Sequence, residues 1–248
     1  MSGHSKWSTI KHAKGVTDAR RSQLFTKLGR EITVAARHGG GDPETNPRLR
    51  LAIANARDGN MPKDTVERAI KRGTGEGSGA ELIEITYEGF GPGGTAILVE
   101  ALTDNRNRAV SDIRNVFSKA GGNLGAAGSV AYLFETRGLI ALDTTEADPE
   151  ELALRAMETS AEDVQVDGNS VEVYTSPEAL ETVRQELTDA EARVASAEIA
   201  KVPKVTIPLD ARKAEQVLRL LDKLDELEDV QRVSSNADFP DEVLAAYA

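Results

Sequence analysis

The chain has 248 residues, enough for one large domain or for two or three small ones. A hydrophobic content of 40% and a charged content of 29% are typical of a globular protein that folds in water. There is no cysteine, which excludes disulfides, thiolate metal sites and cysteine nucleophiles. No apolar run approaches the roughly 18 residues that cross a bilayer, and we find no secretory signal, so we expect neither export nor membrane insertion.

The formal net charge of -11 is distributed unevenly along the chain. Residues 1–72 hold fifteen Lys and Arg against seven Asp and Glu, whereas the remaining residues hold fifteen against thirty-four. A basic N-terminal segment is therefore joined to an acidic body.

Residues 1–72 have the pattern of a small helical domain. Asp18 is a suitable cap for a helix that Gly39-Gly40-Gly41 ends, and its apolar stripe consists of Leu24, Leu28, Ile32 and Ala35. Beside this stripe lies an arc of cations suited to an anion, made of Arg20, Lys27, Arg30 and Arg37.

Two shorter helices follow in the same segment. Asn46-Pro47 opens one that closes near Gly59, and Asp64 with Glu67 matches a capping box for another that ends at Gly73. Residues 73–80, GTGEGSGA, have the composition of a flexible linker.

After residue 80 the apolar period changes to that of strands alternating with helices. Strands are expected at 81–88, 95–103 and 129–135, with a helix over 105–120. Residues 138–200 then read strand, helix, strand, strand, helix, strand, which is the ferredoxin-like βαββαβ unit. A strand near 204–210, a helix through Val217, Leu221 and Leu224, and a strand at 229–235 complete a second such unit with residues 95–135.

The sequence therefore predicts an α+β protein of three domains. We expect a basic helical domain with its linker at 1–80, a discontinuous ferredoxin-like α/β domain at 81–136 and 203–248, and an inserted ferredoxin-like α/β domain at 137–202.

No motif indicates an enzyme, a cofactor or a metal. GFGPGG at residues 89–94 matches G-x-G-x-x-G, but a strand follows it where a dinucleotide site needs a helix, so a tight strand connection is the better interpretation. The histidines His4, His12 and His38 lack metal-site spacing, and no Ser, His and Asp grouping suggests a triad. We expect no catalytic residue, no metal and no cofactor.

The N-terminal segment is a candidate phosphate-binding surface. Its cations lie among small polar residues and comprise Lys6, Lys11, Lys14, Arg20, Arg21 and Lys27, with Trp7 and His12 between them. Such cations bind phosphates by releasing condensed counterions, and Trp7 is able to stack on an unpaired base. The alternatives are that Trp7 packs the tail onto the helical core and that the lysines are only solvated.

A second basic site lies at the start of the helix over 105–120. Arg106 and Arg108 stand at a helix N-terminus, which itself attracts anions. Pairing of these arginines with nearby acids is an equally good interpretation. The glycine-rich loop 121–129 is either a contact surface or a permissive turn.

Three long segments resemble the YebC/PmpR family. They are GHSKWSTIKHAKGVTDARRSQLFTKLGREI, NPRLRLAIANARDGNMPKDTVERAIKRGTG, and YEGFGPGGTAILVEALTDNRNRAVSDIRNVFSKAGGNLGAAGSVAYLFE, and DELEDVQRVSSNAD resembles the family's ending. The resemblance implies a three-domain α/β protein that regulates gene expression. Members are described as DNA-binding transcriptional regulators, while others, including a mitochondrial translational activator of cytochrome c oxidase, act in translation at the ribosome. No catalytic residue is implied, and the cytoplasm of a bacterium is the expected location.

Residues and resemblance together predict a non-enzymatic regulator whose basic head binds nucleic acid, either DNA or ribosomal RNA, the latter on the ribosome. The alternative is a protein interaction module whose basic head contacts an acidic partner without nucleic acid. The sequence does not decide between these, nor does it indicate an oligomeric state.

Overall fold

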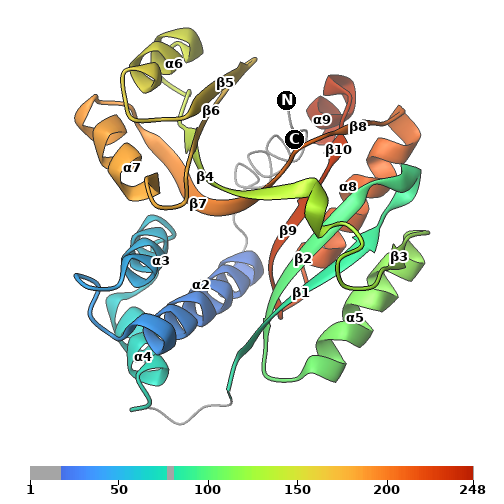
Figure 1. The fold of residues 1–248 in the computed structure, drawn as a ribbon, viewed down its shortest axis with the longest axis horizontal. Coiled ribbons are helices and arrows are strands. Elements are labelled where there is room, and N and C mark those ends of the chain that lie inside the picture. The colour runs from blue at the N-terminus through green and yellow to red at the C-terminus, as the bar shows by residue number, and fades with distance from the viewer. Residues whose placement is uncertain (1–17, 77–80, 248) are drawn as a thin grey trace.

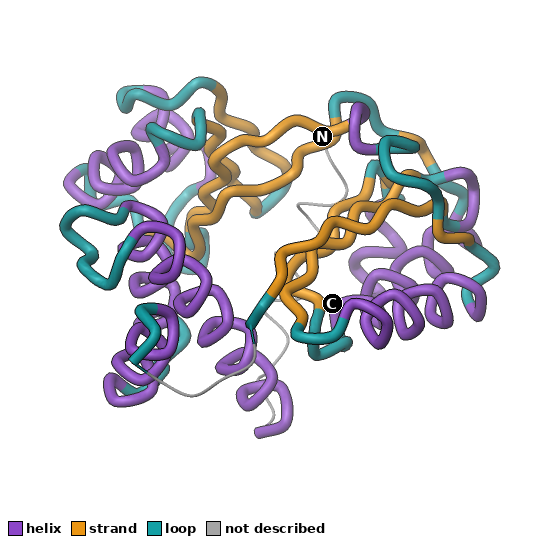
Figure 2. Tube along the Cα trace, turned by 60° about the horizontal axis from the view of Figure 1, so that its bottom comes forward, coloured by secondary structure: helices purple, strands orange, loops and turns teal. Residues whose placement is uncertain are grey.

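The computed structural model describes residues 18–76 and 81–247 and confirms the α+β class. A helical part is followed by two four-stranded sheets, and the strands of the second come between β3 and β9 of the first along the chain (Figure 1). In Figure 2 the two sheets lie between their own helices, which cover the outer sides. The limits given above for the three domains remain a prediction.

The helical part contains α2 (Asp18–Gly39), α3 (Pro47–Asp58) and α4 (Lys63–Gly73). All three agree with the apolar periodicity, and Ile32, Leu49 and Val66 are among the residues of their shared core. Asn46 caps α3 by accepting from the Leu49 N–H at 3.1 Å, as predicted, while its amide donates to the last turns of α2. The predicted capping box of α4 is wrong, because Pro62 occupies the N-cap position and Asp64 lies inside the first turn.

The first sheet has the order β3-β1-β2-β9 and is antiparallel throughout. Its strands are β1 (Ile83–Phe90), β2 (Ala96–Thr103), β3 (Asn123–Leu124) and β9 (Val230–Ser235). The expected second βαββαβ unit is therefore wrong, because β1 and β3 occupy the places in this sheet that were expected for the strands at 129–135 and 204–210. β1 and β2 pair with each other as a hairpin through the short helix η1 (Pro92–Gly94), so β1 belongs to the sheet that was expected to begin with β2.

The expected strand at 129–135 is also wrong in its first half. Residues Ala131–Leu133 form the short helix η2, and only from Phe134 does the chain extend, as β4 (Phe134–Leu142) of the other sheet. The physical reason is packing: Val130 and Phe134 are buried against Ala96 and Leu98, so this apolar run covers one face of β2 instead of adding a strand beside it.

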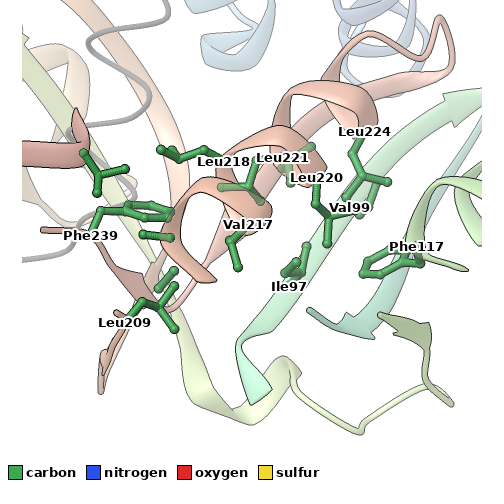
Figure 3. Packing of buried hydrophobic residues seen from close by; sticks show 14 of the residues in the cluster. Ile97, Val99, Phe117, Leu209, Val217, Leu218, Leu220, Leu221, Leu224 and Phe239 are labelled. Atoms are coloured by element: carbon green, nitrogen blue, oxygen red, sulfur yellow. The ribbon is translucent and has the colours of Figure 1, made fainter. Parts of the chain in front are cut away.

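The opposite face of β2 carries the main core. There α5 (Arg106–Lys119) and α8 (Ala211–Asp225) pack on Ile97 and Val99, with Val217 and Leu221 of α8 fully buried (Figure 3). Because both of its faces are covered, β2 needs the continuous apolar run seen in the sequence. The expected strand at 204–210 shortens to β8 (Ile207–Pro208), which pairs with β10 (Ala237–Asp238), and the unpredicted helix α9 (Asp241–Tyr247) adds to this core.

The inserted sheet has the predicted ferredoxin-like βαββαβ order, with strands arranged β5-β6-β4-β7. After β4 come α6 (Pro149–Met157), β5 (Asp163–Asp167), β6 (Ser170–Thr175), α7 (Leu180–Asp189) and β7 (Val194–Pro203). Its core packs both helices on one face of the sheet. The paired ends of β4 and β7, Phe134 opposite Pro203, are where the chain enters and leaves this sheet.

A buried carboxylate fixes the loop between the two sheets. Glu88 of β1 is 7% exposed, and its side chain accepts from the N–H groups of Gly128, Val130 and Ala131 at 2.6, 2.7 and 2.9 Å. Burial acts to raise the pKa of Glu88, but these donors outweigh it, so the pKa lies below its ordinary value of 4.5. The charge is thus stabilised by backbone dipoles.

Glu88→Gln is expected to lower the free energy of unfolding by about 2 kcal/mol, because an amide cannot accept from three donors as a carboxylate does. Since the folded-state pKa is depressed, the stabilisation is complete above pH 4.5 and is lost as the pH falls through the folded-state value. Urea unfolding of both proteins at neutral and acidic pH measures this. The difference should shrink on acidification, and a difference independent of pH would contradict the argument.

The control is Glu81→Gln, which removes a charge from a side chain that is 84% exposed. It should change stability by less than about 0.5 kcal/mol.

Candidate nucleic-acid interface

Several of the predicted site residues lie outside the described residues or carry no described side chain. Lys6, Trp7, Lys11, His12 and Lys14 belong to the first group. Arg20 lies in the first turn of α2, and its side chain is not described. Their role in binding nucleic acid stays a prediction.

The cations of α2 divide between solvent and the protein's own body. Arg21 is exposed. Lys27 Nζ donates to the Asp225 carbonyl at 2.7 Å and to Asp225 Oδ1 at 2.9 Å. Arg30 donates to the Glu228 carbonyl at 2.6 Å, to Glu228 Oε1 at 2.7 Å and to Asp229 Oδ1 at 3.0 Å.

Arg37, further along the same helix, has similar partners. Its Nη1 donates to the Leu82 carbonyl at 3.2 Å and lies 3.8 Å from Glu81 Oε1. Three members of the predicted arc are therefore turned toward acceptors within the chain. The sequence indicated that this arc binds an anion, but it did not reveal that carboxylates of the same chain occupy that position.

The second basic site has the local pairing that the sequence left open. Asn105 caps α5 by accepting from the Arg108 N–H at 3.1 Å, and Arg108 Nη2 lies 2.8 Å from Asp104 Oδ1 and 2.9 Å from Asp229 Oδ2. Hydrogen bonds to Asp229 and Asp104 hold the pKa of Arg108 above its ordinary value. Arg106 is exposed, and its carbonyl accepts from the Tyr87 hydroxyl at 3.5 Å.

Asp229 is the acceptor that these two basic sites share. Its side chain is 7% exposed and accepts from Arg30, from both donors of the Arg108 fork and from the Thr103 hydroxyl at 3.1 Å. Its carbonyl also accepts from the Leu102 N–H at 2.8 Å. A buried carboxylate with two arginine partners joins α2, β2 and α5 at one point, so Arg30 and Arg108 have a structural use.

The outer face of the helical part carries exposed cations that sequence reasoning missed. Val66, Ala69 and Gly73 of α4 face inward, and α4 packs closely on α2, since a Cβ on Gly73 would lie 2.4 Å from the Thr33 carbonyl. The exposed cations of α3 and α4 are Arg57, Lys63, Arg68, Lys71 and Arg72. The signal was present as the four-residue spacing of Arg68 with Arg72, opposite the buried positions.

On α4 the outward cations outnumber the outward acids, which are Asp64 and Glu67. Lys63 and Glu67 are 3.7 Å apart with exposed side chains, a pair of little energetic weight. Arg68 donates to the Asp64 carbonyl and to the Thr65 hydroxyl, and these exposed bonds leave its charge without a carboxylate partner in the described contacts. We call the surface formed by Arg57, Lys63, Arg68, Lys71 and Arg72 the outer basic face.

A cavity of about 640 Å³ lies where the helical part meets both sheets, and its lining does not suit a polyanion. The carboxylates on its wall are Glu31, Glu84, Glu100, Glu178 and Glu181. Its cations are Arg48, Lys201 and Arg232. Arg48 bonds Glu31 and Glu84, and Arg232 bonds Glu198 at 3.1 Å, so both arginines already have acidic partners.

Burial raises the pKa of Glu100 on the cavity wall even though Arg232 and Lys201 act to lower it. Burial likewise disfavours the charge of Arg232, but Glu31, Glu198 and Glu100 outweigh this and raise its pKa. This cavity is therefore an internal junction of mutually compensating charges.

The GFGPGG segment is the turn of the β1–β2 hairpin, as the tight-connection interpretation expects. Gly93 and Gly94 have φ of 78° and 77°, which favours glycine, and η1 runs directly into β2. The loop opens no helix of the kind that binds a pyrophosphate.

Within residues 18–76 and 81–247, no group of three or more His, Asp or Glu side chains is arranged to hold a metal ion. Over those same ranges, none of the helices combines the length and apolar character needed to span a bilayer.

Comparison with known proteins gives family matches along most of the chain. The family model described as the TACO1/YebC protein N-terminal domain matches residues 5–76, and the model described as the TACO1/YebC second and third domain matches residues 82–237. A crystal structure of a conserved hypothetical protein from Aquifex aeolicus is 48% identical, with a TM-score of 0.87 over 93% of this chain and 96% of that one.

Curated relatives are similar over their full length. A probable transcriptional regulatory protein of Dehalococcoides mccartyi is 56% identical over 247 residues, which is 100% of this chain and 98% of the relative. Proteins of the same description from Rubrobacter xylanophilus and Treponema pallidum are 56% and 55% identical, over 100% and 98% of this chain and 100% of each relative. The resemblance seen in the sequence is confirmed, and the chain belongs to the TACO1/YebC family.

Proposed function

We propose that this protein is a non-enzymatic, nucleic-acid-binding regulator of gene expression that contacts its target through the helical part. The curated relatives are named probable transcriptional regulatory proteins, which supports a regulatory role. The observation that carries the proposal is the outer basic face, whose exposed cations lie on the part of the chain that is basic overall, while the rest of the chain is strongly acidic.

The proposed contact is electrostatic and limited in extent. Phosphates bind lysine and arginine without base-specific contacts, and the gain comes largely from counterion release. The acidic sheets would repel a long duplex lying across the whole molecule. A short stretch of DNA, or a protruding element of ribosomal RNA in the ribosome, fits this charge distribution better than a wrapped duplex.

Reversal of charge on α4 tests the contact. Arg68→Glu combined with Arg72→Glu is expected to weaken retention of DNA and RNA by at least about tenfold at low salt. If both side chains touch phosphates, the slope of log K against log salt should become shallower by about 1.4 to 1.8. Fluorescence anisotropy of a labelled oligonucleotide across a salt series measures both quantities.

The matched control reverses two exposed arginines on the acidic body, Arg212→Glu with Arg219→Glu on α8. It changes the net charge by the same amount and should alter affinity far less. If the two double variants lower the affinity equally, binding depends on the net charge of the protein and not on the α4 surface. Unchanged retention by the α4 variant would favour the alternative, a module whose basic head binds an acidic protein.

A separate experiment distinguishes the two nucleic-acid targets. If promoter DNA is the target, the protein should protect a defined sequence at near-physiological salt and discriminate it from random duplex. If the ribosome is the target, the protein should co-sediment with ribosomal particles, and cells lacking it should show ribosomes paused at particular codons. Co-sedimentation combined with ribosome profiling measures the second outcome, and an absence of both outcomes would contradict the proposal.

A further inference from the structure

The side of α2 that faces the body carries a stripe of donors at helical spacing. Gln23, Lys27 and Arg30 lie four and three residues apart, so they share one face of the helix. Gln23 Nε2 donates to the Glu226 carbonyl at 2.7 Å and to the Asp225 carbonyl at 3.2 Å. Together with the bonds of Lys27 and Arg30 described above, this stripe meets the end of α8 and the loop that follows it.

The acceptors at that end of α8 form an anionic site. The last turn of a helix presents carbonyl groups without intrahelical partners and carries the negative end of the helix dipole. Carboxylates of Asp225, Glu228 and Asp229 add to this potential. Lys27 and Arg30 therefore bind a cluster of carbonyl and carboxylate oxygens, and the anionic phosphate oxygens of a nucleic-acid backbone are acceptors that the same side chains bind.

We call this set of contacts, Lys27 and Arg30 on α2 with Asp225, Glu228 and Asp229 on the body, the latch. The side chains of Lys27 and Arg30 are only 13% and 14% exposed, so a bound nucleic acid cannot reach them while the latch is closed. Glu228 is 73% exposed, which leaves one side of the site open to solvent.

The joint between the helical part and the sheets is largely polar in the residues that the structure describes. The apolar core of the helical part is a cluster of its own, and Leu51 of α3 is the residue of this part that packs on the core of the inserted sheet. Other contacts across the joint include the ion pairs of Arg48 with Glu84 at 3.0 Å and of Arg184 with Asp58 at 3.1 Å. Polar joints between parts of a chain open at modest cost and respond to salt.

We propose that the latch is autoinhibitory: the carboxylates of the body occupy a phosphate site on α2, and phosphates of a nucleic acid displace them, releasing the helical part from α8. This inference rests on the proposed function. Opening would add Lys27 and Arg30 to the outer basic face as phosphate ligands. The closed state would therefore lower the apparent affinity by the fraction of molecules that are open.

Substitution on the carboxylate side tests the latch, because it leaves both cations in place. Asp225→Asn with Glu228→Gln is expected to bind a short oligouridylate at least about fivefold more tightly than the unaltered chain. A merely structural role predicts the opposite direction, weaker or equal binding. Asp229 is kept, since it also holds Arg108 and Thr103.

The control is Glu215→Gln on α8 with Glu226→Gln directly after it, which makes the same change in net charge. The described side-chain partners of these residues are Arg219 and Lys223, not residues of α2. It should bind like the unaltered chain. Glu228→Gln alone changes a largely exposed side chain, so it should leave the fold intact. It should give part of the gain in affinity for oligouridylate.

Opening of the latch is measured on the same proteins by resonance energy transfer between two dyes, one on the helical part and one on α8. The chain has no cysteine, so Glu67→Cys on α4 and Arg212→Cys on α8 accept a pair of dyes specifically. The efficiency of energy transfer should change when oligouridylate or salt is added. In the Asp225→Asn, Glu228→Gln protein, the change should occur at a lower salt concentration than in the unaltered chain. Binding by the unaltered chain with no gain in the latch variant and no change in transfer would overturn the latch and leave the proposed function standing. Failure of every protein to bind DNA or RNA would overturn both.

Discussion

The contact of the helical part with the first sheet centres on one buried carboxylate, that of Asp229. Asp229 follows α8, is 7% exposed, and receives Arg30 from α2, Arg108 from α5 and Thr103 from β2. A buried carboxylate is costly unless charged donors surround it, and here each arginine supplies both charge and hydrogen bonds. The same residue ties its backbone to Leu102. The bond of Arg30 to Asp229, with that of Lys27 to Asp225, holds α2 with these two cations facing the body.

That orientation separates the cations of the N-terminal segment into two classes. Lys27, Arg30 and Arg37 satisfy carbonyls and carboxylates within the chain, while the outer basic face, which contains Arg68 and Arg72, points to solvent. A count of charges along the sequence treats both classes alike. Only the exposed class contributes to the field that an approaching polyanion meets, because a paired cation is already compensated at short range.

The elements that the sequence predicted well are those set by local pattern. The end of α2 at Gly39, the Asn46 cap and the ferredoxin-like order of the inserted sheet follow from periodicity, capping and turn residues within short windows. Apart from the capping box of α4, the errors concern choices made at long range. Whether the apolar run before Phe134 adds a strand or covers β2 depends on the hairpin partner β1, and the shortening of β8 depends on β10, residues that lie far along the chain.

The candidate site shows the same division between local pattern and distant partners. Helical spacing was enough to place Lys27 and Arg30 on one face of α2, but it could not identify Asp225 and Glu228, about two hundred residues away, as the anions that they meet. The four-residue spacing of Arg68 and Arg72 was equally visible in the sequence. The cations of a basic segment joined to an acidic body have two possible kinds of partner, an external polyanion and the carboxylates of the body itself. In the described residues, the inner face of α2 contacts the second kind of partner, whereas the outer basic face on α3 and α4 remains exposed.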